Sequence, residues 1–145
     1  MAVRFRDLCG DPTEFGDYPS AQFIVSGEPG DVEDLLLQGA VFQHRIAILI
    51  RQSLTNHGIS QAKYAGEVLM TEDRLTRLLK GYLPMSPTDI AVAMSTLDPH
   101  RRWTIDPASW MKEATKNAFT AADLMPPSVV WPTEVGERIR MPRLF

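Results

Sequence analysis

The chain has 145 residues, of which 44% are hydrophobic, and a formal net charge of −3. This length suits one domain with its own core, and the single cysteine, Cys9, excludes both an intramolecular disulfide and a metal site built from several thiolates. We expect no signal peptide and no membrane span, since the most apolar window, residues 46–50, is short and is followed by Arg51; cysteine usage favours the reducing cytoplasm.

Residues 1–30 are rich in glycine, proline and aspartate and predict an irregular acidic arm, with a short extended piece at residues 22–26. Helical spacing begins after this arm, where Asp31 is a suitable N-cap. The apolar residues at that spacing are Leu35, Leu36, Phe42, Ile46, Leu49, Ile50 and Leu54. Gly39 lies inside the stretch and either separates two helices or sits within one long helix.

The next two helices are short and have clear start and stop residues. Gly58 ends the first helix, because glycine adopts the left-handed conformation that closes a helix. Ser60 caps a second helix that runs to about residue 68. Thr71 caps a third, which ends near Lys80 with Gly81 as its stop.

Two more helices are predicted towards the C-terminus. A fourth helix over residues 88–97 opens at Ser86 or Pro87. Its inward side chains are predicted to be Ile90, Ala91, Ala93, Met94 and Leu97. A fifth helix begins after Asp106, which is followed by a proline suited to the first helical position, and runs to about Phe119.

These elements predict an all-α fold, a compact bundle of about five helices with irregular N- and C-terminal arms. We expect three parts along the chain. Residues 1–30 form the irregular acidic arm, residues 31–98 form a helical domain, and residues 99–145 form a C-terminal helix and arm for packing or dimerisation. Within the last part, residues 129–131 form either a short strand or a packed piece of the arm.

Basic charge is concentrated in the middle of the chain. Residues 1–43 hold two basic and eight acidic side chains, residues 44–82 hold six basic and three acidic, and residues 83–145 hold seven of each. A local basic surplus is what attraction to nucleic-acid phosphates requires. Ordinary scatter of charge on solvated helix faces would also produce a surplus of this size.

The second and third helices have the spacing of a helix-turn-helix. Two short helices that cross steeply need a small residue at the crossing, and Ala65 lies at that position. The apolar residues that flank it along the chain are Tyr64, Val68, Met70, Leu75 and Leu78. A two-residue turn at 69–70 leads directly into the next helix. A plain antiparallel helical bundle has similar apolar spacing and stays open as the alternative.

Residues 45 to about 97 resemble the lambda-repressor/Cro-like family, also called the XRE family. The residues that carry the resemblance are Ile50-Arg51, Gly58-Ile59-Ser60-Gln61, Ala65 and Gly81. The resemblance implies a compact DNA-binding domain from a transcriptional repressor, an antitoxin or a phage regulator. The family commonly carries glycine in the turn where this chain has Leu69, a departure that leucine can accommodate if its backbone stays right-handed.

The resemblance also implies that the helix at 71–80 enters the major groove with its N-terminal half against the bases. Arg74 or Arg77 would then pair with guanine, and Thr76 would touch a thymine methyl group or a phosphate. Glu72 is either a cytosine contact or, with Asp73, a carboxylate that suits the helix dipole. The expected DNA-binding residues are Arg51, Ser60, Gln61, Lys63, Thr71, Glu72, Arg74, Thr76, Arg77 and Lys80.

The histidines and the cysteine are predicted to have structural roles rather than chemical ones. His44, His57 and His100 lack the spacing of metal ligands and are predicted to be surface or turn residues. Cys9 is predicted to be buried rather than nucleophilic. The chain shows no nucleophile–base pair and no glycine-rich phosphate loop, so neither an enzyme nor a cofactor is expected.

We therefore expect a sequence-specific, double-stranded DNA-binding transcriptional regulator, most simply a repressor, that acts as a homodimer because one helix contacts few bases. The alternative is a protein-interaction module or an antitoxin that uses the same scaffold, with the acidic N-terminal segment as its partner surface. The basic stretches at 100–102 and 138–143 are predicted to be a solvated connector and tail, or additional DNA contacts. The tryptophans that would pack the C-terminal part or form a subunit interface are Trp103, Trp110 and Trp131.

Overall fold

The computed structural model describes residues 4–25 and 28–117, and the regular elements within them are helices. Five are α-helices: α1 (Val32–Asn56), α2 (Gln61–Glu67), α3 (Glu72–Leu79), α4 (Pro87–Leu97) and α5 (Pro107–Thr115). Two are short 3₁₀ helices, η1 (Phe5–Leu8) and η2 (Pro12–Glu14). The predicted all-α bundle is confirmed.

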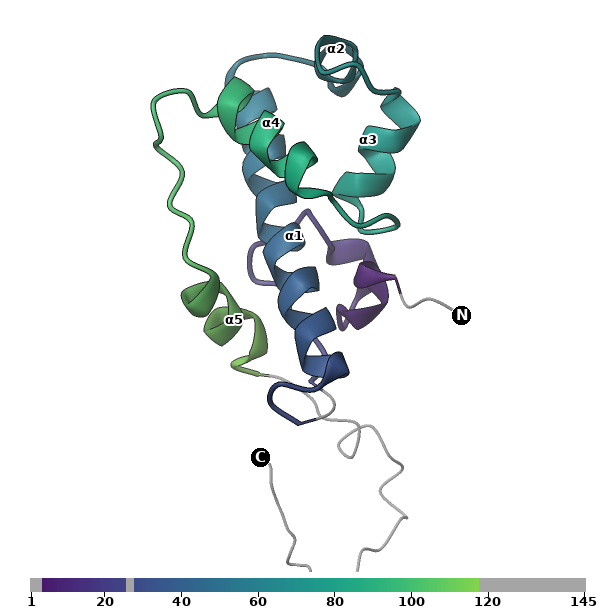
Figure 1. Ribbon diagram of the computed structural model, residues 1–145, viewed down its shortest axis with the longest axis vertical. Coiled ribbons are helices and arrows are strands. Elements are labelled where there is room, and N and C mark those ends of the chain that lie inside the picture. The colour runs from purple at the N-terminus through teal and green to yellow at the C-terminus, as the bar shows by residue number, and fades with distance from the viewer. Residues whose placement is uncertain (1–3, 26–27, 118–145) are drawn as a thin grey trace, which may run out of the picture.

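Helix α1 is the central element of the bundle (Figure 1). Helix α5 and η1 pack against α1, and so do α3 and α4. Gly39 lies inside this single helix rather than dividing it, and a Cβ at Gly39 would lie 3.1 Å from the Phe5 ring. The glycine therefore lets η1 approach α1 closely, which accounts for a residue that is otherwise unfavourable in a helix interior.

The start of each α-helix follows its capping residue. The side chains of Asp31, Ser60, Thr71, Ser86 and Asp106 each accept a hydrogen bond from the backbone N–H three residues further on. Helix α4 has a full capping box, since the Asp89 side chain also accepts from the Ser86 backbone. These local contacts satisfy N–H groups that a helix start leaves unpaired, and so the predicted starts are confirmed.

The N-terminal segment, residues 4–25, is irregular as predicted but does not stand off as an arm. Cys9, Phe15, Ala21 and Phe23 are buried in the same core as α1. Backbone hydrogen bonds join its two halves, with Gly10 N–H donating to Gln22 O at 2.8 Å. The apolar side chains spaced through this acidic segment supply part of the core, so removing residues 1–30 would disrupt the fold as well as remove acidic charge.

His44 is a second correction, because it was predicted to lie at the surface. Its side chain is buried on α1 against the rings of Phe15 and Phe23, with centroid distances of 5.4 and 5.2 Å. Gly16 N–H donates to His44 Nδ1 at 2.7 Å. His44 is therefore a polar link between α1 and the N-terminal segment. His57 and His100 are exposed, as predicted.

The C-terminal elements cover α1 less completely than predicted. On α4, Ala93 and Leu97 are buried, but Ala91 and Met94, which were predicted to face inward, are exposed. The predicted packing of tryptophans on the bundle is confirmed for two of them: Trp103 Nε1 lies 3.3 Å from Ser53 Oγ, and the Trp110 ring lies 5.7 Å from that of Phe42. The predictions for residues 118–145, Trp131 included, lie outside the described residues.

Candidate nucleic-acid interface

Helices α2 and α3 form a compact pair at one end of the molecule (Figure 1). Tyr64 and Ala65 of α2 are buried. On α3 the buried side chains are Leu75, Leu78 and Leu79, which leaves the other face of the helix open. Sequence spacing placed the small residue and the apolar residues on the buried side. The structure agrees for Tyr64, Ala65, Leu75 and Leu78, and it leaves Val68 and Met70 partly buried.

The turn between the two helices differs from the prediction at Leu69. Its φ is +61°, so the backbone is left-handed rather than right-handed. Met70 N–H donates to Ala65 O at 2.9 Å and Leu69 N–H donates to Gly66 O at 3.3 Å. These two bonds are the Schellman pattern that closes a helix through one left-handed residue. The need to end α2 abruptly overrides the preference of leucine for right-handed backbone.

Replacing Leu69 by glycine is expected to stabilise the fold by about 1 kcal/mol, because glycine adopts positive φ without strain. The Leu69 side chain is 94% exposed, so its removal sacrifices almost no buried area. Chemical denaturation measures the effect. Leu69→Ala is the matched control, since it removes the exposed side chain but keeps the strained Cβ and should change stability little. A loss of stability in Leu69→Gly would show that the turn is not left-handed.

Two residues predicted to bind DNA, Ser60 and Thr71, are the capping residues of α2 and α3. Ser60 Oγ accepts from Lys63 N–H, and Thr71 Oγ1 accepts from Arg74 N–H, each at 3.1 Å. Both residues are exposed. Because each hydroxyl acts as an acceptor towards its helix, its own hydrogen is left for an outside acceptor such as a phosphate oxygen.

Arg74 is held by α4 rather than free on the outer face. Its Nη1 and Nη2 each lie 3.0 Å from one carboxylate oxygen of Asp89, which is 12% exposed. Burial by itself would raise the pKa of Asp89, but hydrogen bonds from Arg74 and Ser86 outweigh it and the pKa lies below its usual range. Arg74 therefore ties α3 to α4 instead of facing outward as a predicted base contact, and its replacement is expected to reduce stability.

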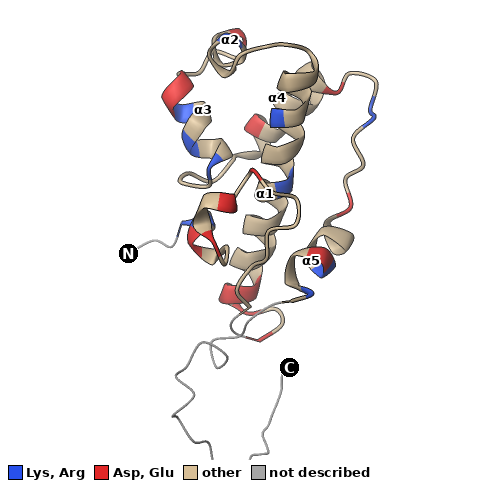
Figure 2. Cartoon of the chain, turned by 180° about the vertical axis from the view of Figure 1, so that it is seen from behind, with Lys and Arg blue, Asp and Glu red and all other residues tan. Residues whose placement is uncertain are grey.

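Arg77 is the arginine that the outer face of α3 offers. Its only ion pair among the described residues is with Asp73, four residues earlier, at 3.0 Å between Nε and Oδ2. Both side chains are more than half exposed, and such pairs contribute about 0.3–0.5 kcal/mol. Figure 2 shows the acidic residues at the start of α3 and basic residues along the rest of it. A stronger acceptor can therefore displace Asp73 from Arg77.

The remaining predicted residues lie either on the α2–α3 pair or in a hollow next to it. Gln61 and Lys63 lie on α2, half-buried and exposed respectively, next to the capping hydroxyl of Ser60. Thr76 is half-buried on α3, and Glu72 is exposed in the first turn, where a carboxylate suits the dipole. The two that the structure places elsewhere are Arg51 and Lys80, which line a hollow between α1, the end of α3 and the N-terminal segment.

A buried residue that sequence reasoning missed is Gln43 on α1. Its Nε2 donates to Leu78 O at 2.8 Å and to Leu83 O at 2.7 Å, and its Oε1 accepts from Met85 N–H at 2.6 Å. Gln43 thus holds the end of α3 and the loop that leads to α4. The sequence offers little signal for this role, because Gln43 is followed by a histidine and an arginine and forms part of a polar run; only the folded chain shows that this buried amide has partners.

Metal and thiol chemistry find little support in the described residues. Across 4–25 and 28–117, no group of three or more histidine, cysteine, aspartate or glutamate side chains is placed to hold a metal ion. Burial raises the pKa of the Cys9 thiol to about 11, so the nucleophilic thiolate is scarce at neutral pH. In the same part of the chain, no helix has both the length and the apolar character needed to cross a membrane.

Comparison of the chain with protein-family models, with curated protein sequences and with solved structures yields no match. The features of the molecule that bear on function are the geometry of α2 and α3 and the charges that they carry.

Proposed function

We propose that the chain is a sequence-specific, double-stranded DNA-binding protein of the lambda-repressor/Cro-like kind, and that it represses transcription by occupying its site. The observation that supports this proposal is the α2–α3 pair. A tight turn joins two short helices, the inner face of α3 is buried, and its outer face presents Arg77 with only a weak intrahelical partner. In a helix-turn-helix, the second helix has this arrangement, and its exposed face lies in the major groove.

In this proposal the outer face of α3 lies against the base edges. Arg77 leaves Asp73 and donates two hydrogen bonds to O6 and N7 of a guanine. Thr76 is one residue away and contacts a thymine methyl group. Lys63 and the Gln61 amide bind phosphates that flank the groove, which fixes the position of α3 without adding sequence preference. Arg74 supports α3 from behind through Asp89.

A second copy of the chain belongs to the proposal because a helix of eight residues, the length of α3, reads few base pairs. Two copies related by a two-fold axis would place their α3 helices in successive major grooves, about 34 Å apart. A cytoplasmic location is part of the same proposal, since the DNA of a repressor's target gene must be accessible to it.

Selection of bound duplexes from a random pool at physiological salt tests the proposal. Enrichment of a motif, with two-fold symmetry if a dimer reads it, is the expected result. Arg77→Ala should then lower affinity for the selected duplex by about 5- to 150-fold, the loss of one bidentate contact worth ~1–3 kcal/mol. Its affinity for unrelated DNA should fall much less, because phosphate contacts remain.

Two variants serve as controls for the arginine. Lys112→Ala on α5 removes the same charge from an exposed residue away from α3 and should leave binding unchanged. Asp73→Asn removes both the repelling carboxylate and the partner of Arg77 and should tighten binding several-fold. Equal losses in Arg77→Ala and Lys112→Ala, or no enriched motif from the folded protein, would contradict base reading by α3.

A protein-interaction role is the second candidate, and the folded state of the N-terminal segment favours it. Asp11 and Asp17 are exposed on a segment that packs on the core, so their carboxylates have fixed positions, whereas Asp7 is paired with Arg4. Fixed carboxylates suit a basic partner protein, as in an antitoxin. Absence of an enriched DNA motif would make this the favoured function.

A further inference from the structure

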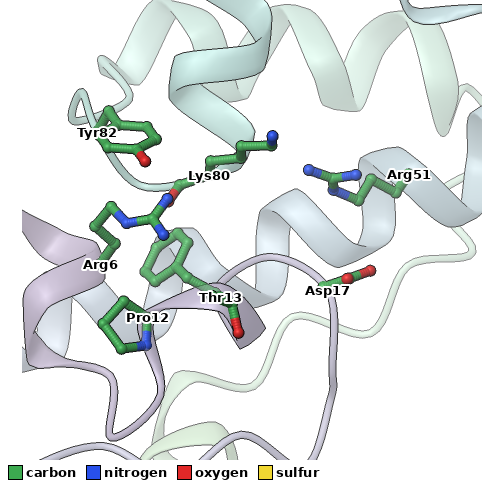
Figure 3. Close-up of a pocket in the computed structure, with 8 residues that line it drawn as sticks. Arg6, Pro12, Thr13, Asp17, Arg51, Lys80 and Tyr82 are labelled. Atoms are coloured by element: carbon green, nitrogen blue, oxygen red, sulfur yellow. The ribbon is translucent and has the colours of Figure 1, made fainter.

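A hollow of about 200 Å³ lies where the N-terminal segment meets α1 and the end of α3 (Figure 3). Its lining residues come from three parts of the chain that are distant in sequence. They are Arg6, Pro12, Thr13, Phe15, Asp17, Arg51, Lys80 and Tyr82. The packing of the N-terminal segment on the core, which the sequence did not reveal, creates this hollow.

Three of the lining residues are cations, and one is a carboxylate. Among the described residues, Arg6, Arg51, Lys80 and Asp17 take part in no ion pair. In Figure 3 the Lys80 ammonium and the Arg51 guanidinium point towards one another across the hollow. Like charges held together repel, and the single carboxylate of Asp17 offsets only one of the three cations, so the arrangement is more stable when an anion also lies between them.

Arg6 is positioned by two contacts, and Arg51 has a donor that no described residue accepts. The Arg6 guanidinium lies 4.1 Å from the centroid of the Tyr82 ring, and its Nη1 donates to Lys80 O at 3.2 Å. Arg51 Nε is buried and has no hydrogen-bond acceptor within the part of the chain that the structure describes. A buried donor without an acceptor is costly, and a guanidinium is suited to bind oxyanions.

We infer that this hollow binds the phosphate group of a small anion. Arg51 and Lys80 bind the phosphate oxygens from two sides, and the unused donors of Arg6 complete the site. The rings of Pro12, Phe15 and Tyr82 line the rest of the hollow, and the volume admits the organic part of a small phosphate monoester. This assigns Arg51 and Lys80 to a site separate from the base-reading face of α3.

Calorimetric titration with inorganic phosphate and with glycerol phosphate, at constant ionic strength set by chloride, tests the inference. We expect saturable one-to-one binding with a dissociation constant below about 10 mM. Arg51→Gln and Lys80→Gln should each weaken it at least tenfold. Asp17→Asn should tighten it several-fold, because among the described residues Asp17 supplies the only carboxylate that lines the hollow.

The matched control is Lys112→Gln, which lowers the net charge equally at an exposed position on α5 and should not alter phosphate affinity. Lys80 is itself exposed, so Lys80→Gln should retain the helical circular dichroism even if Arg51→Gln does not. Absence of saturable binding, or equal weakening in Lys80→Gln and Lys112→Gln, would overturn the site.

A second experiment, with DNA, identifies the source of the phosphate. With a duplex bound to the protein, a slope of log affinity against log salt that falls by about one in Arg51→Gln assigns the site to a backbone phosphate. An unchanged slope, with phosphate binding lost, assigns it to a free small anion. The calorimetry needs no DNA, so failure of the phosphate site and failure of DNA recognition are separate results.

Discussion

Gly16→Ala is expected to destabilise the fold by about 3 kcal/mol or more. The φ of Gly16 is +74°, and a Cβ there would lie 2.0 Å from Leu79 O and 3.2 Å from the Cβ of Ala47. The obstacle is a backbone carbonyl at the end of α3, which cannot rotate aside as a side chain can. Either the N-terminal segment must lift from α1 and α3, or α3 must shift.

Gly58→Ala separates backbone strain from the clash. Gly58 has a similar φ of +64°, but a Cβ there meets no atom within 4 Å. This control should cost only about 1 kcal/mol, the strain of a left-handed alanine. Denaturant melts of the two variants measure the difference directly. Equal costs would mean that the segment around Gly16 does not pack against the end of α3.

The second large effect is loss of stability in mild acid through His44. Burial, reinforced by the charge of Arg45, lowers the pKa of His44 to about 4 in the folded chain. The unfolded chain takes up this proton below about pH 6.5, whereas the folded chain does not until about pH 4. Stability should therefore fall as the pH drops from about 6.5 to 4, by a total of ~3 kcal/mol.

Denaturant melts across this range, together with NMR titration of the His44 ring, measure the effect. His44→Gln is the informative variant, because it keeps a polar side chain near Gly16 N–H but cannot take up a proton. It should lower stability at pH 7 and flatten the dependence between pH 6.5 and 4. A His44 ring that titrates near pH 6.5 in the folded protein would refute the buried neutral imidazole.

The helices could be predicted from sequence because the residues at which they begin and end are decided by residues close by in the chain. Ser60 and Thr71 accept from N–H groups only three residues away, and the apolar spacing of α3 lies within eight residues. The contact between α2 and α3, which follow each other directly in the chain, is equally local. Each of these features is decided by interactions that a short stretch of chain contains in full.

The parts that could not be predicted depend on residues far apart in sequence. His44 is buried because Gly16, 28 residues earlier, donates to it, and composition alone made the segment around Gly16 resemble a loose acidic arm. Arg74 is withdrawn from the outer face by Asp89, 15 residues later. The sequence pattern thus located the candidate interface. It could not show which arginine of that interface lacks a partner on another helix, because only the folded chain brings such partners together.

The pairing of Arg74 with Asp89 has a consequence for how α3 would meet a groove. The Asp89 carboxylate accepts a hydrogen bond from Ser86 N–H at the start of α4 and also binds the Arg74 guanidinium through both oxygens, so one carboxylate fixes the relative position of two helices. Under the proposed function, α3 is therefore preorganised, and little ordering entropy is lost when DNA binds. Weakening this link should lower affinity for every duplex alike and leave the ranking of sequences unchanged.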